Sequence, residues 1–156
     1  MNTVLHELTF LIAAYNTKFQ AIPDSDFSAK PHPHKWSKKE VVGHLIDSAQ
    51  NNLRRFLVGQ YDTQPPHIVY DQDSWVTANG YQHMKKEEVI ALWKLINERI
   101  AEVLKSMPEQ HYTKECNTGK AEVQLRTLHW LAEDYIRHMK HHINQVIPGS
   151  FDIAYP

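Results

Sequence analysis

The sequence has little cysteine and no long hydrophobic run. Cys116 is the only cysteine in the chain, so no intramolecular disulfide can form and a zinc site built on several thiolates is excluded. No apolar stretch approaches the roughly 20 residues that a membrane-spanning helix requires. Residues 1–16 lack the basic region of a secretory signal, so we expect a cytoplasmic protein without a membrane partner.

A strong net charge is also missing. Lysine and arginine together number 17, aspartate and glutamate number 18, and the net charge is -1 with neutral histidines. This balance argues against the broad basic field of a nucleic-acid-binding protein, so no nucleic acid is an expected partner. The HExxH zinc-protease pattern, the GxSxG nucleophile motif and a glycine-rich phosphate loop are absent as well.

What the sequence does contain is helical periodicity. Apolar residues recur on one face of about residues 3–21, 37–59, 85–107 and 123–146. Ser37 and Glu40 have the spacing of a capping box at the start of the second stretch. The length of the chain fits one domain over residues 1–156, so we predict an all-α protein with the fold of a four-helix bundle.

The connections between these helices are predicted to be long. Residues 22–36 contain three prolines and are expected to form a loop. Residues 60–83 form a connection of unusual length, which is typical of a functional or lid-like segment. Residues 109–122 include a turn sequence at 117–119, which is compatible with a short hairpin between the third and fourth helices.

Histidines are abundant, with 11 in the chain, and two of them have a spacing suited to metal binding. His138 and His142 lie four residues apart and therefore share one helix face. At about 100° per residue, His142 falls about 40° from His138 beside the apolar residues, whereas His141 falls about 60° to the other side. We therefore expect His141 at the rim or in solvent. Two ligands from one helix are too few for a tight site, so a third must come from elsewhere in the chain.

The second helix carries a polar stripe beside its apolar face, formed by His44, Ser48, Asn51 and Asn52. Buried polar groups need partners, and a metal pocket with bound water would provide them. Ser48, Asn51 and Asn52 are therefore candidate pocket residues that orient water or substrate. The remaining histidines without convergent spacing are predicted not to be ligands; they are His6, His32, His34, His67, His83, His111 and His129.

Several segments in order resemble one known family. The similarity covers residues 36–37, 42–48, 51–56, 70–75 and 135–142. With these segments the chain resembles the DinB/YfiT-like superfamily, which includes metal-dependent hydrolases and thiol S-transferases such as the bacillithiol transferases. The resemblance implies a four-helix bundle with one bound metal ion, often zinc or nickel. It also implies that the ligands are a histidine of the second helix and an HxxxH pair of the fourth.

On this sequence those ligands would be His44, His138 and His142. Three neutral imidazoles leave a divalent ion with its full charge and an open position, which is the pattern of a catalytic site. Such an ion lowers the pKa of bound water toward about 7, or holds a thiol as thiolate. Since protonated imidazole is no ligand, metal affinity is expected to fall below about pH 6.

The reaction and the partners stay open at this stage. One interpretation is an enzyme, either a metal-dependent hydrolase of a small-molecule substrate or a transferase for a low-molecular-weight thiol. The alternative is a non-enzymatic bundle in which metal stiffens the fold or senses stress, or which binds protein partners. A homodimer is a further option, because apolar bundle faces often pair.

Overall fold

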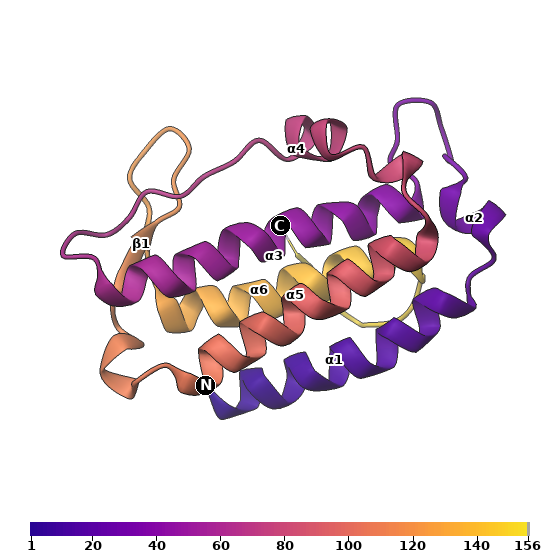
Figure 1. Ribbon diagram of the computed structural model, residues 1–156. Helices are drawn as coiled ribbons and strands as arrows, with labels where there is room; N and C mark the ends of the chain where they lie inside the picture. The colour runs from indigo at the N-terminus through magenta and orange to yellow at the C-terminus, as the bar shows by residue number, and fades with distance from the viewer. Residues whose placement is uncertain (156) are drawn as a thin grey trace.

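The computed structural model describes residues 1–155, and its four long helices pack as a bundle (Figure 1). These helices are α1 (Asn2–Ala21), α3 (Lys38–Tyr61), α5 (Lys86–Ser106) and α6 (Leu128–Val146). Helix α3 packs against both α5 and α6, and α1 packs mainly against α5. The predicted all-α four-helix bundle is confirmed. Within the described residues, no helix is long and apolar enough to cross a membrane.

The apolar faces of the four helices meet in one core. Phe19 of α1 and Trp93 of α5 are fully buried, and their rings meet edge to face with centroids 5.2 Å apart. Leu45 of α3 and Leu128 of α6 are equally buried in the same cluster. Burial of each large apolar side chain contributes about 1.5–3 kcal/mol. The stripes found in the sequence therefore supply the packing that orients α3 and α6 toward each other.

Helix α3 begins as predicted. The Ser37 hydroxyl accepts a hydrogen bond from the Glu40 amide at 3.1 Å, and the Glu40 carboxylate accepts one from the Ser37 amide at 2.8 Å. This reciprocal pair satisfies two amides at the helix start. The start of α3 is thereby fixed one residue after Ser37, at Lys38.

Helix α6 begins later than the sequence indicated. Residues 123–127, predicted as helix, are outside it, and three of them form strand β2 (Leu125–Thr127). Strand β2 pairs antiparallel with β1 (Glu115–Asn117), which is the short hairpin compatible with the sequence. The Thr127 side chain then accepts from the Trp130 amide at 3.1 Å and caps α6. The backbone groups that would extend the helix are instead used in the hairpin.

Two connections that were predicted to be loops contain short helices. Segment 22–36 includes α2 (Asp24–Ser28), which follows Pro23 and buries Phe27 completely. The connection after α3 includes α4 (Gln72–Asn79) and the single turn η1 (Tyr81–His83), and another turn, η2 (Glu109–His111), follows α5. Figure 1 shows that the connection after α3 runs back along the outside of α3, with α4 lying over that helix.

Turn η1 is anchored on α3 close to His44. The Tyr81 ring covers Gly43, where any side chain would meet the ring within 2.2 Å. The Tyr81 hydroxyl donates to the Asp47 carboxylate at 2.7 Å, and the Asn79 amide donates to the same oxygen at 2.9 Å. Asp47 and Tyr81 are both buried. This contact fixes the first turns of α3 and so helps to position the His44 side chain.

Candidate metal centre

Three imidazoles converge between α3 and α6. His44 lies on α3, and His138 and His142 lie one turn apart on α6. One nitrogen of each ring lies within 4.8 Å of the others. His44 Nε2 and His138 Nε2 are 3.2 Å apart, and the His142 ring centroid is 4.5 Å from that of His44 and 4.4 Å from that of His138. The structure thus brings together the three histidines singled out in the sequence.

The spacing of these nitrogens fits a single metal ion. Two nitrogens bound to one tetrahedral zinc at about 2.0–2.1 Å lie about 3.3 Å from each other. The 3.2 Å between His44 Nε2 and His138 Nε2 is close to this value. Imidazole nitrogen suits zinc, nickel and copper alike. The donor set therefore fits one divalent transition metal, and no second cluster of this kind occurs within residues 1–155.

Neighbouring polar groups orient the two imidazoles of α6. His142 Nδ1 lies 2.9 Å from the side-chain Oε1 of Gln145, so Nδ1 donates to this oxygen and leaves Nε2 as the ligand atom. The Gln145 amide also lies 3.1 Å from His141 Nε2, and Ser48 Oγ lies 3.4 Å from His138 Nδ1. Gln145 was not predicted from the sequence. Its position three residues after His142, one turn along the same helix, was the available signal.

His44 is held mainly by packing. It is 1% exposed, and the Trp36 ring lies against its imidazole with centroids 5.1 Å apart. His44 Nδ1 is buried and has no hydrogen-bond partner among residues 1–155. Trp36 precedes the cap of α3, so the same segment that starts the helix also covers this imidazole. Trp36 belongs to the family-like sequence pattern, but its contact with His44 was not predicted.

Burial keeps the imidazoles neutral. Loss of solvent lowers the pKa of His44 from 6.5 to about 3, with the charge of His142 as a smaller cause. Burial likewise lowers the pKa of His142 to about 4 and that of His138 well below 6.5. Neutral imidazole is the form that binds metal. Competition from protons therefore begins at lower pH than the value near 6 that ordinary histidines suggest.

The metal-free protein is expected to lose stability as the pH falls from 6.5 toward 4. In the unfolded chain the histidines take up protons near 6.5, whereas burial lowers the pKa of His44 and His142 in the folded protein. The unfolded state therefore binds more protons in this window, and acid favours unfolding. Asp47 acts in the opposite direction, because burial raises the pKa of its carboxyl to about 6.

Urea unfolding of chelator-treated wild type and His142→Ala across this pH range measures the effect. Asp47 is common to both proteins, so the difference between their unfolding free energies isolates the buried imidazole. Wild type should lose stability more steeply on acidification than His142→Ala. Equal pH dependence in the two proteins would contradict the expectation.

The converging imidazoles of α6 face a wide cleft. His138, His141 and His142 line a cleft of about 1030 Å³, and Trp36 lines it from the segment before α3. His141 is half-buried there at the rim, as the helical spacing predicted. The cleft leaves space next to the imidazoles for a ligand larger than water.

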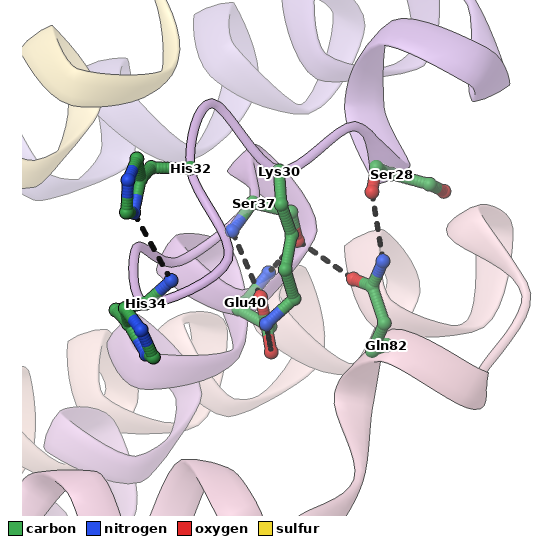
Figure 2. Close-up of polar contacts among 7 residues, drawn as sticks. All are labelled: Ser28, Lys30, His32, His34, Ser37, Glu40 and Gln82. Carbon is green, nitrogen blue, oxygen red and sulfur yellow. Dashed lines mark hydrogen bonds and ion pairs between the residues drawn. The ribbon is translucent and has the colours of Figure 1, made fainter.

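The opposite wall of the cleft is tied to the bundle by polar contacts (Figure 2). Lys30 forms an ion pair with Glu40 at 2.7 Å. The Ser37 hydroxyl donates to the side-chain Oε1 of Gln82 at 2.7 Å. The side-chain Nε2 of Gln82 donates to the Ser28 backbone carbonyl at 2.7 Å. Segment 28–37 is thereby fixed both to α3 and to η1. These contacts fix the wall of the cleft in place relative to the bundle.

The predicted pocket residues take different places. Ser48 and Asn52 line a second, smaller cavity that also reaches His138. Asn51 lines neither cavity, because its amide turns to the backbone carbonyl of Asp47 at 2.9 Å. The structure thus places Ser48 and Asn52 beside the histidine cluster and Asn51 apart from it.

Comparison with known proteins identifies the family. The model of the DinB superfamily matches residues 7–146, which is most of the chain and includes all three converging histidines. The chain belongs to the DinB superfamily. Among DinB relatives, it is 22% identical over 127 residues to YfiT of Bacillus subtilis strain 168, a candidate metal-dependent hydrolase. That match covers 81% of this chain and 71% of YfiT.

Solved structures show the same fold. The YfiT structure, described as an unusual four-helix bundle, gives a TM-score of 0.82 at 20% identity, covering 93% of this chain and 82% of YfiT. A mycothiol-dependent maleylpyruvate isomerase gives 0.74 at 10% identity, and the match covers 91% of this chain but only 59% of the isomerase. A DinB-like protein of Bacillus subtilis gives 0.65 at 16% identity, with 98% and 96% coverage. The DinB fold is therefore shared with proteins of different named activities.

Proposed function

We propose that this DinB protein is a metal-dependent enzyme that activates a nucleophile at one divalent transition metal. The observation that carries the proposal is the meeting of three neutral imidazoles, from His44, His138 and His142, beside an open cleft of about 1030 Å³. A divalent transition metal with an open position supplies a nucleophile at neutral pH, because it lowers the pKa of a coordinated water or thiol. Zinc and nickel are the metals we propose.

The side chains around the imidazoles hold the ligands in place and shape the cleft. Gln145 fixes the ring of His142, and Trp36 covers the ring of His44 and limits the access of water. Ser48 fixes the ring of His138 and, with Asn52, presents polar groups that orient a reactant. Such groups are effective when their own geometry is locked by the fold.

We propose transfer of a low-molecular-weight thiol to an electrophile as the reaction, and hydrolysis as the second candidate. The volume of the cleft favours the first, since two organic reactants need more space than one reactant and water. A structural relative is named as mycothiol-dependent, which supports the use of a thiol. The relative YfiT is described as a candidate metal-dependent hydrolase, which supports the second reaction.

Steady-state assays of the zinc- and nickel-loaded protein test the proposal. We expect thiol-dependent conversion of monochlorobimane, or hydrolysis within a panel of esters and amides, that is lost after treatment with chelator and restored by metal. His138→Ala should reduce the rate to background, because it removes one of the three ligands. His6→Ala is the matched control, since this exposed histidine lies on α1 away from the cluster.

The same experiment separates the enzyme from the non-enzymatic alternative. Metal content and thermal unfolding are measured for each protein beside the rate. A wild-type protein that binds one metal ion and gains stability from it, yet turns over no thiol, ester or amide, supports a purely structural metal. Turnover that survives both chelation and His138→Ala would refute the proposal.

A further inference from the structure

A second cavity lies on the other side of His138. It has a volume of about 290 Å³, close to the lower end of the range for ligand pockets. Polar and apolar side chains share its lining, and the polar ones include Ser48, Asn52, Arg55, Tyr70 and Arg126. His138 also lines the large cleft, so the two spaces meet at one of the converging imidazoles.

Arg55 brings a positive charge into this cavity. Its Nε and Nη2 atoms donate to the Ile68 backbone carbonyl at 3.1 and 2.6 Å. Its Nη1 atom donates to the side-chain Oδ1 of Asn52 at 3.2 Å. A guanidinium has five N–H groups, so these three bonds leave two N–H groups for another acceptor. Within residues 1–155, Arg55 forms no ion pair with a carboxylate.

The other charges of the cavity leave it positive. Arg126 stands at the exposed rim, with its guanidinium 4.7 Å from the Trp130 ring centroid. Asp134 is the acidic lining residue, and its two oxygens are occupied by Arg137 at 3.2 Å and by the Tyr155 hydroxyl at 3.2 Å. Two arginines thus face one carboxylate that already has partners. A half-buried cation without an anionic partner favours the binding of an anion.

Polar contacts connect Arg55 to the histidine cluster. Asn52 accepts from Arg55 through Oδ1 and donates through Nδ2 to Ser48 Oγ at 3.3 Å. Ser48 Oγ in turn lies 3.4 Å from His138 Nδ1. Residues 48, 52 and 55 follow one another along one face of α3, about one turn apart. The cation and the imidazole are therefore held in a fixed relation by one helix.

We propose that Arg55 binds the carboxylate of a small organic acid whose reacting group lies at the histidine cluster. A carboxylate suits this place, because its two oxygens match the two remaining N–H groups of a guanidinium. The cavity accommodates a small acid and opens toward His138. The role of this acid as a reactant rests on the proposed function, but carboxylate binding at Arg55 is measurable without turnover.

Titration of isotope-labelled protein by NMR tests the inference, with propionate as the probe and propionamide as its uncharged counterpart. Metal-free and zinc-loaded protein should both bind propionate, and bind propionamide at least tenfold more weakly. Arg55→Gln should weaken propionate binding about tenfold or more, the range for a hydrogen bond to a charged group. Arg54→Gln makes the same charge change at the exposed neighbouring position and should leave the affinity within twofold.

Arg55→Lys is a second, more conservative variant, needed because Arg55 also binds the Ile68 carbonyl and Arg55→Gln could unfold the protein. It keeps the charge but not the paired N–H groups, so we expect several-fold weaker propionate binding in a folded protein. Equal affinities of Arg55→Lys and wild type would overturn the inference, as would equal binding of acid and amide. Propionate binding only to zinc-loaded protein and unchanged by Arg55→Gln would overturn it too, since the carboxylate would then bind the metal.

Metal content and thiol turnover measured on the same samples keep the two proposals apart. Arg55-dependent binding in a protein that holds no metal supports the carboxylate site and removes the proposed function. Metal binding and turnover without any dependence of propionate affinity on Arg55 support the function and remove the carboxylate site.

Discussion

Replacement of His142 by alanine is expected to abolish stoichiometric zinc binding, with a loss of affinity of at least about 100-fold. Loss of a residue that only supports a ligand already weakens metal affinity by about 10–100-fold, so loss of a direct ligand should exceed this range. Replacement of the neighbouring His141 should leave the affinity within about threefold, because His141 contacts Gln145 rather than the cluster centre. The two variants lose the same chemical group from adjacent positions of α6.

Zinc content by mass spectrometry and competition with a chromogenic chelator measure the two affinities. Circular dichroism of both variants shows whether each is folded before metal is added. Strong zinc binding by His142→Ala together with weak binding by His141→Ala would mean that α6 turns the side chain of His141, and not that of His142, toward α3. Strong binding by both variants would show that zinc is held elsewhere.

Gly43→Ala is expected to destabilise the fold by about 3 kcal/mol, near the upper range for adding atoms to a packed site. Helix propensity alone predicts the reverse, since alanine is favoured over glycine by about 1 kcal/mol within a helix. The added methyl group would, however, lie 2.2 Å from Cδ2 of the Tyr81 ring, which is itself only 2% exposed. Displacing that ring separates its hydroxyl from Asp47 and leaves a buried carboxyl with fewer partners.

Urea unfolding of a double-mutant cycle measures this effect. In a Tyr81→Ala background the ring is gone, so Gly43→Ala should be neutral or stabilising by up to about 1 kcal/mol. The free energies of the single and double variants then give the coupling between the two positions directly. The same destabilisation in both backgrounds would show that the ring does not cause it.

Features that depend on neighbouring residues could be predicted from the sequence. Ser37 and Glu40 are three residues apart, and their spacing alone defines the cap that starts α3. In the same way, the period of one helix predicts that His138 and His142 lie on the same face of α6. Thr127 shows the limit, because residues 125–127 are drawn into pairing with 115–117, and this pairing competes with the helical pattern. Helix α2 is too short for periodicity to reveal it.

The charged part of the site was not predicted, although helical spacing offered a signal for it. Arg54 and Arg55 are chemically identical neighbours, and both belong to a helix with a broad polar side. Helical spacing puts Arg55 on the face of Ser48 and Asn52 and turns Arg54 away by about 100°. The connection after α3 then places the Ile68 carbonyl against Arg55, while Arg54 stays in solvent. What the helix period could not show is the cavity itself, because its other walls come from distant segments of the chain.

His44 and His138 are separated by 94 positions along the chain, yet their rings face each other. An ion held between them would join two helices that otherwise meet through side-chain packing and the polar contact of Ser48 with His138. By mass action, free metal at 100 times the dissociation constant stabilises the native state by about 2.7 kcal/mol. Under metal starvation this increment disappears, the unfolded fraction rises, and proteases degrade the chain faster. The abundance of the protein would then follow the metal supply of the cell.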